Sequence, residues 1–381
     1  MTAIAPGALV AVLGAGTMGR GIARVAAGYG HPVALFDSSE EALRSAEIDI
    51  HRYLQRDVEK GRLDESAAAA ISGRIEFTSS VAAVAGSALV VEAIVEDLPA
   101  KVSLLREVES QIDATAILAT NTSSLSVTAI AAGLAVPGRV AGMHFFNPAP
   151  VMPLVEIVAG AESQTDVLDS LAATAAAWGK TPVRAKSTPG FIVNRVARPF
   201  YGEALRVVEE GVASPAQVDK IITGAGGFRM GPFAVMDLVG LDVNLAVSRS
   251  VYEQSFHDPR FAPNQIQQQL VDAGRLGRKT GSGFYDYTSD ATDEAVVPLP
   301  SPEPASAVIV HGSGGELTGL VTRLEQAGVT TTAGYGPAAG ISAGSALLWP
   351  SDGRPVSAVD SLAPDLTIVA VDECVDLSLI H

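Results

Sequence analysis

The sequence has little cysteine and no long apolar run, and each shortage excludes a class of protein. A single cysteine, Cys374, excludes an intrachain disulfide and a cysteine-based metal site, which agrees with a reducing compartment. No run of about eighteen apolar residues occurs, and the N-terminus lacks the basic and apolar regions of a signal peptide. We therefore expect a cytoplasmic protein with no membrane partner and no metal ion.

Positive charge is also scarce. The 381 residues include 26 Lys and Arg against 42 Asp and Glu, so the formal net charge is -16. This balance argues against nucleic acid and against anionic membranes as partners. An anionic ligand would have to be held by local basic residues or by backbone dipoles. The length itself suggests two or three domains.

The clearest pattern in the chain lies at residues 9–37. Five apolar residues, 9–13, predict a buried strand, and three glycines follow in the spacing G-x-G-x-x-G. Gly14 permits a tight bend, Gly16 lets the backbone approach a pyrophosphate, and Gly19 lets the next helix lie close to the strand. The glycines therefore predict a phosphate-binding turn.

The residues after the glycines complete this pattern. A helix is predicted from Met18 to Gly28 or Gly30, and the N–H groups of its first turn would face an anion. A strand at 33–36 follows and ends in Asp37, whose carboxylate can accept both hydroxyls of an adenosine ribose. An acid at this position would repel a 2′-phosphate. The order of these features predicts a dinucleotide site and favours NAD over NADP.

Strands and helices continue to alternate up to residue 186, which predicts parallel pairing with right-handed crossovers. The further strands are expected at 75–77, 88–94, 116–119, 139–145, 154–158 and 182–185. The further helices are expected at 38–60, 79–85, from Pro99 onward, 127–132 and 165–178. From residue 186 to Phe256 only helical patterns follow, starting at Pro189-Gly190 and at Ser214-Pro215. Nearer the C-terminus, strands are expected at 307–310 and 366–371, a helix at 317–326 and an apolar run at 346–349.

We therefore expect an α/β protein: a Rossmann-type doubly wound sheet, an all-helical domain and a small C-terminal α/β unit. The expected boundaries are 1–186 for the NAD-binding domain, 187–287 for the helical domain, 288–305 for a proline-rich acidic linker and 306–381 for the last unit. The turn at 311–315 lacks the acid and the full spacing of the first glycine turn, so we expect no nucleotide there. The chain stops at His381 in mid-pattern, which predicts that more sequence follows.

Two polar clusters have a functional and a structural interpretation. Residues 120–124, T-N-T-S-S, crowd the carboxyl end of a strand, where open α/β sheets bind ligands. The alternative is a capping turn, for which Ser126 alone would suffice. The second helix ends with the basic residues 52, 56, 60 and 62. They form either a solvated helix face or a binding surface for phosphates.

A histidine and a glutamate on neighbouring strands form a candidate catalytic pair. His144 ends one strand and Glu156 lies twelve residues later, so an antiparallel return would bring the two side chains together. Oxidation of a secondary alcohol needs a base for the hydroxyl proton, and a histidine oriented by a carboxylate suits this role. The alternatives are a structural histidine and an ordinary ion pair of Glu156 with a surface base.

Over residues 8–287 the sequence resembles the L-3-hydroxyacyl-CoA dehydrogenase family. The resemblance depends on eight ordered motifs: G-A-G-T-M-G, V-V-E-A-I-V-E-D, A-T-N-T-S-S-L, H-F-F-N-P, M-P-L-V-E-I, T-P-G-F-I-V-N-R, R-M-G-P-F and G-R-K-T-G-S-G-F-Y-D-Y.

The resemblance implies a set of site residues. His144 would be the catalytic base and Glu156 its orienting acid, while Ser123 and Asn194 would hydrogen-bond the reacting oxygen of the substrate. Lys60 would contact CoA, and Tyr53 stands where some members have a CoA-contacting serine. The implied NAD contacts are Gly14, Ala15, Gly16, Thr17, Met18, Gly19, Asp37, Glu96, Lys101, Ser123, Asn147 and Lys279.

The resemblance also implies a reaction: reversible, NAD-dependent oxidation of an L-3-hydroxyacyl-CoA to the 3-ketoacyl-CoA. It implies a homodimer formed by the helical domain, and a role in fatty-acid or phenylacetate-type degradation. The last unit resembles the extra region of longer bacterial relatives that act on 3-hydroxyadipyl-CoA or 3-hydroxybutyryl-CoA. Two alternatives remain: a non-catalytic relative that binds NAD and acyl-CoA, and a 3-hydroxyacid dehydrogenase for free acids, a group that commonly uses a lysine base.

Overall fold

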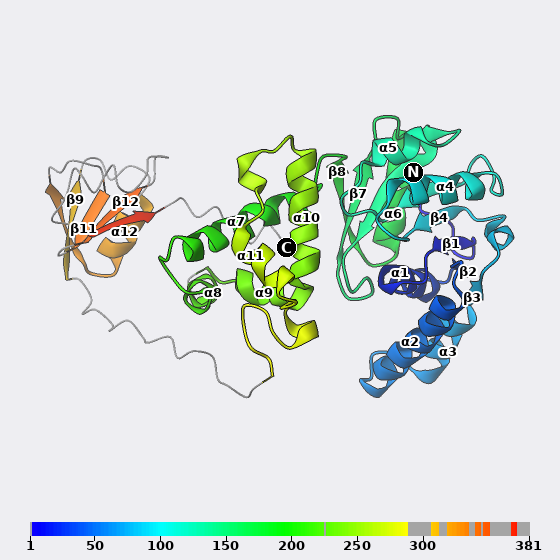
Figure 1. The fold of residues 1–381 in the computed structure, drawn as a ribbon, viewed down its shortest axis with the longest axis horizontal. Coiled ribbons are helices and arrows are strands. Elements are labelled where there is room, and N and C mark those ends of the chain that lie inside the picture. The colour runs from blue at the N-terminus through cyan, green and yellow to red at the C-terminus, as the bar shows by residue number, and fades with distance from the viewer. Residues whose placement is uncertain are drawn as a thin grey trace. The chain divides into compact units, whose positions relative to one another are not determined.

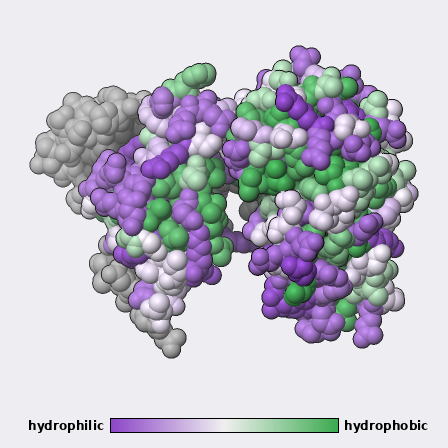
Figure 2. Space-filling view, turned by 45° about the vertical axis from the view of Figure 1, so that its right-hand side comes forward, coloured by the Kyte–Doolittle hydropathy of each residue, from purple (hydrophilic) through white to green (hydrophobic). Residues whose placement is uncertain are grey.

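The computed structural model describes residues 2–224, 226–288, 306–311, 318–334, 340–343, 346–350 and 367–371. The chain divides into two compact units, 1–294 and 295–381, whose ribbon and surface are drawn in Figure 1 and Figure 2. The boundaries expected from the sequence at 186, 287 and 305 stay predictions.

An eight-stranded sheet forms the first part of unit one. Its strands are β1 (Val10–Leu13), β2 (Val33–Phe36), β3 (Ile75–Thr78), β4 (Leu89–Glu92), β5 (Ile117–Thr120), β6 (Val140–Phe145), β7 (Leu154–Ala159) and β8 (Thr181–Lys186). Its helices are α1 (Thr17–Gly28), α2 (Glu40–Glu59), α3 (Glu65–Gly73), α4 (Leu98–Glu109), α5 (Val127–Ala132) and α6 (Thr165–Ala177).

The order of the strands locates the ligand-binding edge. The order is β3-β2-β1-β4-β5-β6-β7-β8, and every neighbouring pair is parallel except β6 with β7. Strand β1 has β2 on one side and β4 on the other, so the chain reverses its direction of winding there. In open α/β sheets this switch point leaves a crevice at the carboxyl ends of the strands, which is where ligands bind.

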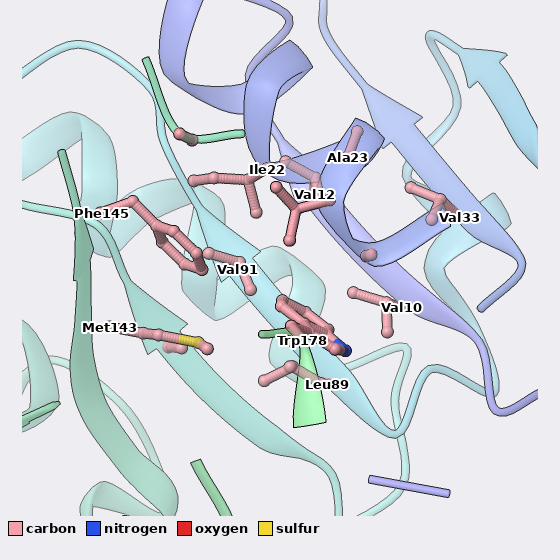
Figure 3. Packing of buried hydrophobic residues seen from close by; sticks show 14 of the residues in the cluster. Val10, Val12, Ile22, Ala23, Val33, Leu89, Val91, Met143, Phe145 and Trp178 are labelled. Atoms are coloured by element: carbon pink, nitrogen blue, oxygen red, sulfur yellow. The ribbon is translucent and has the colours of Figure 1, made fainter. Parts of the chain in front are cut away.

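Both faces of the sheet are buried. Val10 and Val12 of β1 belong to one hydrophobic cluster, and the alternate residues Ala11 and Leu13 belong to a second cluster on the opposite face. Figure 3 shows the first cluster, in which Trp178 packs close to strand residues of β1 and β4. The two clusters hold helices on both faces, which confirms the predicted doubly wound α/β fold class.

Two helical predictions differ from the structure. The helix expected at 79–85 is wrong, because only a 3-10 turn, η1 (Val81–Val84), forms there. Ser80 makes no side-chain cap, and Gly86, with φ of 77°, turns the chain toward β4 before a full α-helix can form. Helix α3 was not predicted, since its alanines show no apolar periodicity. It begins where Asp64 accepts a hydrogen bond from the N–H of Ala67.

The second part of unit one is helical. It contains α7 (Val193–Glu209), α8 (Pro215–Gly224), α9 (Pro232–Val239), α10 (Leu241–Gln254) and α11 (Gln265–Asp272). Buried Asp237 accepts hydrogen bonds from the N–H groups of Phe284 and Tyr285 and from the hydroxyl of Tyr287. Burial and this carboxylate raise the pKa of Tyr287 to about 12. The chain after α11 is thereby fixed to the helices.

In its described residues, the second unit contains a smaller sheet of the order β10-β9-β11-β12-β13 and one helix. Its elements are β9 (Ala307–His311), α12 (Thr318–Gln326), β10 (Thr330–Gly334), β11 (Gly340–Ala343), β12 (Ala346–Pro350) and β13 (Thr367–Val371). Strands β10 and β11 were not predicted. Residues 289–305, 312–315, Cys374 and His381 lie outside the described residues. In the part that is described, no helix is long and apolar enough to cross a membrane.

Candidate active site

The glycine turn after β1 has the geometry that a dinucleotide requires. Gly14 has φ of 104°, and a Cβ there would lie 2.6 Å from the carbonyl oxygen of Ala93. A Cβ on Gly19 would lie 1.7 Å from the carbonyl oxygen of Gly14, so α1 can approach β1 this closely only without a side chain. A Cβ built on Gly16 meets no described atom within 4 Å. The turn is therefore closed toward the sheet and open outward.

The N-terminus of α1 and Asp37 border this open space. Helix α1 begins after Gly16 without a side-chain cap, so the N–H groups of its first turn and its positive dipole end are available to an anion. Asp37 Oδ2 accepts a hydrogen bond from the N–H of Ala15 (2.8 Å), and Oδ1 accepts one from the N–H of Ser39 (2.9 Å). These bonds place the carboxylate beside the turn. The arrangement fits the adenosine diphosphate part of NAD.

A cleft of about 800 Å³ in unit one brings seven of the sixteen predicted site residues together. Hydrophobic side chains gather along both of its walls in Figure 2. The predicted residues that line it are Met18, Glu96, Lys101, Ser123, His144, Asn147 and Asn194. The cleft therefore joins the carboxyl edge of the sheet to helix α7.

His144 and Glu156 form the hydrogen-bonded pair that the sequence predicts. The antiparallel register of β6 and β7 places the two residues directly opposite each other. His144 Nδ1 lies 2.7 Å from Glu156 Oε2, and the two residues are 5% and 0% exposed. Because a carboxylate oxygen only accepts, Nδ1 carries a proton and Nε2 of the neutral ring has a free lone pair. No hydrogen-bond partner of Nε2 occurs within the described ranges of the chain.

Glu156 also connects the sheet to helix α7. Its second oxygen, Oε1, accepts hydrogen bonds of 2.9 Å from the N–H groups of Ile192 and Val193, at the start of α7. The positive end of this helix favours the charged carboxylate. Asn194 is the next residue of the helix and lines the cleft. One buried carboxylate thus orients His144 and positions the helix that carries Asn194.

Two aromatic rings pack against the imidazole. The ring centroid of His144 lies 4.6 Å from that of Phe146 and 5.7 Å from that of Phe191. Phe191 is buried and has φ of 49°, which is unfavourable for a phenylalanine. Its packing against His144 offsets part of this cost. The two rings restrict the motion of the imidazole and the access of water to it.

The polar loop after β5 serves mainly to hold Glu96. The Glu96 carboxylate accepts hydrogen bonds from the hydroxyl of Thr122 (2.6 Å) and from the N–H groups of Ser123 and Ser124 (2.9 Å each). Ser126 caps α5, because its hydroxyl oxygen accepts a hydrogen bond from the N–H of Ala129. This is the capping role that the alternative interpretation predicted. The loop therefore caps a helix and also organises the cleft. Ser123 keeps a place on the cleft lining.

Lys101 is a buried cation between two carboxylates. Its Nζ lies 2.7 Å from Glu92 Oε1 and 3.2 Å from Glu96 Oε2, and the Lys101 side chain is 1% exposed. Burial raises the pKa of Glu96, but Lys101 and the hydrogen bonds from Thr122, Ser124 and Ser123 outweigh it, so the net pKa is lowered. Sequence analysis missed Glu92. An acid inside the otherwise apolar run 88–94 was the signal that could have identified it.

Replacement of Lys101 by methionine is expected to lower the free energy of unfolding by roughly 3–5 kcal/mol. Glu92 would keep its hydrogen bonds from the N–H of Ile94 and the hydroxyl of Thr120, but it would stay buried without a counter-charge. Urea denaturation measures this loss. The double variant with Lys101→Met and Glu92→Gln should recover most of it, because the amide carries no charge. Equal stability of the Lys101→Met variant and the wild type would contradict the role given to this pair.

Lys279 differs from the other predicted NAD contacts. Its Nζ forms an ion pair with Asp242, with distances of 2.6 and 2.7 Å to the two carboxylate oxygens. It is not among the side chains that line the cleft. A contact of Lys279 with NAD therefore stays a prediction.

A second pocket, of about 780 Å³, contains the predicted CoA contact Lys60. Asn147 and Pro148 line both this pocket and the cleft, so the two spaces adjoin. Arg20 forms an ion pair with Asp49, and both Arg24 and Arg62 form ion pairs with Asp57. In contrast, Arg56 and Lys60 have no ion-pair partner within the residues that the structure describes. Tyr53 also lines this pocket.

Two family models match unit one. The model described as 3-hydroxyacyl-CoA dehydrogenase, NAD binding domain, matches residues 9–188, and the model described as 3-hydroxyacyl-CoA dehydrogenase, C-terminal domain, matches residues 190–287. Together they cover the glycine turn, the cleft and the helices α7 to α11.

Curated proteins match the same region. The chain is 48% identical over 290 residues to the 3-hydroxyadipyl-CoA dehydrogenase of Escherichia coli K12, covering 76% of this chain and 61% of that protein. It is 40% identical over 276 residues to a probable 3-hydroxybutyryl-CoA dehydrogenase of Deinococcus radiodurans, covering 72% of this chain and 99% of that protein. The chain thus spans less than two thirds of the length of the E. coli relative.

Solved structures share the fold. The 3-hydroxybutyryl-CoA dehydrogenase from E. coli K12 superposes with a TM-score of 0.77 at 38% identity and covers 97% of this chain and 81% of that chain. The (S)-3-hydroxybutyryl-CoA dehydrogenase from Ralstonia eutropha superposes with a TM-score of 0.71 at 37% identity, covering 74% of this chain and 99% of that chain.

Proposed function

The chain belongs to the 3-hydroxyacyl-CoA dehydrogenase family of NAD-dependent oxidoreductases that act on a CH–OH group, and from this premise we propose that it oxidises L-3-hydroxyacyl-CoA to 3-ketoacyl-CoA. The observation that carries the proposal is the His144–Glu156 pair, whose imidazole faces the cleft that Ser123 and Asn194 also line. The match to both family models supports the reaction class.

We assign the proton transfer to His144. Its Nε2 takes the proton of the substrate hydroxyl, while Glu156 keeps Nδ1 protonated and stabilises the imidazolium that forms. NAD, when bound, accepts the hydride that leaves the same carbon. In the reverse direction the imidazolium returns the proton. Ser123 and Asn194 would donate hydrogen bonds to the reacting oxygen from positions already fixed by the sheet edge and by α7.

We propose that NAD lies along the carboxyl edge of the sheet. The open side of the glycine turn and the first turn of α1 would hold the pyrophosphate, and Asp37 would accept the ribose hydroxyls. Glu96, Lys101 and Asn147 lie in the cleft toward His144, where the nicotinamide end would bind. This placement brings the hydride acceptor to the same cleft as the base.

Turnover of purified protein tests the proposed function. With L-3-hydroxybutyryl-CoA we expect NADH formation from NAD, and kcat/KM about 100-fold lower with NADP because Asp37 repels the 2′-phosphate. The D-enantiomer and free 3-hydroxybutyrate are the controls. Turnover of the free acid at the same rate would favour a 3-hydroxyacid dehydrogenase. NAD and acyl-CoA binding without turnover would favour a non-catalytic relative.

We infer that the pocket beside α2 binds the phosphates of CoA. Arg56 and Lys60 are one helical turn apart, so two like charges that lack an acidic partner in the described structure face the same pocket. An anionic ligand would relieve their repulsion. The pocket adjoins the cleft at Asn147, so a CoA held there could extend its acyl group toward His144.

Replacement of Lys60 by alanine is expected to raise KM for 3-hydroxybutyryl-CoA about 10-fold with little change in kcat, since one charge-assisted contact is worth roughly 1.4 kcal/mol or more. Steady-state kinetics measures the change. The pantetheine thioester of the same acyl group lacks the nucleotide phosphates, and its KM should not respond. Arg44→Ala is the matched control, because Arg44 lies on the same helix, pairs with Glu40 and does not line the pocket. An equal rise in KM for both thioesters would refute the phosphate contact.

Three further expectations stay predictions: the homodimer, the cytoplasmic location and a role in fatty-acid or phenylacetate-type degradation. We propose the homodimer and the pathway on the family resemblance, and the location on the composition, which includes a single cysteine. The acyl group is also open at this point, since the named relatives act on 3-hydroxyadipyl-CoA in one case and on 3-hydroxybutyryl-CoA in others.

A further inference from the structure

Arg198 is a buried cation in the wall of the active-site cleft. It lies in α7 one helical turn after Asn194 and is 6% exposed. Its Nε donates a hydrogen bond to the carbonyl oxygen of Asn194 (3.2 Å), and Nη1 donates to the carbonyl oxygen of Asn244 (3.1 Å) and to Ser248 Oγ (3.0 Å). The guanidinium carbon lies 4.9 Å from the ring centroid of Tyr201. All of these partners are neutral.

The charge of Arg198 is not balanced by a carboxylate anywhere in the described parts of the chain. The other deeply buried cations are balanced: Lys101 lies between Glu92 and Glu96, and Arg139 pairs with Glu109 at 3.2 Å. Burying a charge without a counter-charge is costly, so proteins rarely retain such an arrangement without a ligand or a partner. An arginine remains charged in this setting.

One end of the guanidinium remains available. Nε and Nη1 are used by the protein, whereas Nη2 has no hydrogen-bond partner among the described residues. Nη2 is not fully buried either, because it is not one of the fully buried polar atoms that lack a partner in the described structure. Because Arg198 lines the cleft, a ligand there can reach this donor.

We propose that Arg198 binds a carboxylate at the far end of the acyl chain, so that the preferred substrates are CoA thioesters of 3-hydroxy dicarboxylic acids. The proposal rests on the proposed function, because it uses Asn194 as a contact of the reacting oxygen. Side chains one helical turn apart are separated by about 5–6 Å at their Cβ atoms. Two methylene groups and a carboxyl group extend roughly 4–5 Å beyond the reacting carbon, from C–C bonds of about 1.5 Å. The two spans match.

The other anions of the ternary complex have separate sites. The NAD pyrophosphate would bind at the glycine turn, and the CoA phosphates would bind beside Arg56 and Lys60. The thioester and the hydroxyl group are neutral. The lining of the same cleft includes the half-exposed side chains of Val239 and Val243, which suit methylene groups. A terminal carboxylate is therefore the anion that remains for Arg198.

The test compares two substrates of equal chain length, 3-hydroxyadipyl-CoA and 3-hydroxyhexanoyl-CoA, which differ in a terminal carboxylate or methyl group. We expect wild-type kcat/KM to be about 100-fold higher for the dicarboxylic substrate, because a site built to hydrogen-bond a substrate group discriminates strongly against its absence. The Arg198→Met variant should lose this preference through a fall in kcat/KM for 3-hydroxyadipyl-CoA alone. Arg198→Lys retains the charge and should retain part of the preference.

The matched control is Arg195→Met. Arg195 lies on the same helix, its guanidinium stacks on the Phe261 ring, and it does not line the cleft. This variant should keep the wild-type preference. Equal wild-type kcat/KM values for the two substrates would overturn the proposal, and this result does not depend on whether a variant folds. An equal fall in kcat/KM for both substrates in Arg198→Met would also overturn it. Either result leaves the dehydrogenase function intact, whereas no turnover of either thioester would refute the proposed function itself.

Discussion

The His144→Ala variant is expected to have kcat/KM about 10³- to 10⁴-fold below wild type, because a positioned general base contributes up to about 10⁴-fold. Its Kd for the cofactor, measured with NADH, should stay unchanged. The imidazole is the only proposed proton acceptor, and it lies in the cleft. The adenosine end of the cofactor is proposed to bind elsewhere, at the glycine turn and Asp37. The loss should therefore fall on turnover and not on cofactor binding.

Stopped-flow turnover and fluorescence titration with NADH separate these two quantities. The matched control is His51→Ala, since His51 lies on the exposed face of α2 and hydrogen-bonds Ser72, away from the cleft. Small imidazoles added to the His144→Ala variant should restore part of the activity, because they can enter the space of the lost ring. Wild-type turnover by purified His144→Ala protein would disprove the assignment of the base.

Replacement of Glu156 by glutamine is expected to have the second large effect. We expect kcat to fall about 10²- to 10³-fold. The carboxylate accepts three hydrogen bonds, from His144 Nδ1 and from the N–H groups of Ile192 and Val193. A glutamine amide has one oxygen and one NH₂ group. If its NH₂ group faces Nδ1, it favours the tautomer in which Nε2 carries the proton, and that tautomer cannot act as the base. If it faces α7, it opposes two N–H donors.

The two orientations have different signatures. A wrong tautomer lowers kcat and leaves the melting temperature almost unchanged, whereas a clash with α7 also lowers the free energy of unfolding, by about 1–3 kcal/mol for the unsatisfied groups. The kcat, its pH profile and thermal denaturation distinguish them. Glu162→Gln, an exposed change just after β7, is the control. An unchanged kcat in Glu156→Gln would show that the carboxylate does not orient the base.

Much of the candidate site could be predicted from the sequence because its signals are local. Glycines at fixed spacing can have only a few roles, and Gly14 and Gly19 indeed sit where a Cβ would collide with the backbone. The pairing of His144 with Glu156 was also predictable, because the turn between two neighbouring strands sets which residues lie opposite each other. The fold class and the family follow from the same local patterns.

Other residues could not be assigned from the sequence, because their role depends on partners far away in the chain. Glu92 was only one residue inside the strand expected at 88–94, yet it neutralises Lys101 inside the protein. Arg198 was not singled out by any sequence pattern, although it is buried without a carboxylate within the described structure. The polar loop at 120–124 looked ready to bind a ligand, but most of its groups hold Glu96.

The sequence by itself determined the strands of the eight-stranded sheet, most of its helices, the glycine turn and the identity of the candidate base, because backbone conformation and hydrophobic periodicity act over a few neighbouring residues. Only the tertiary structure decided which charges are buried and what balances them. That distinction requires the positions of side chains more than twenty residues apart, such as Glu96 and Ser123 or Arg198 and Asn244. Electrostatic free energy depends on burial and distance in three dimensions, and neither quantity is written in the local pattern of residues.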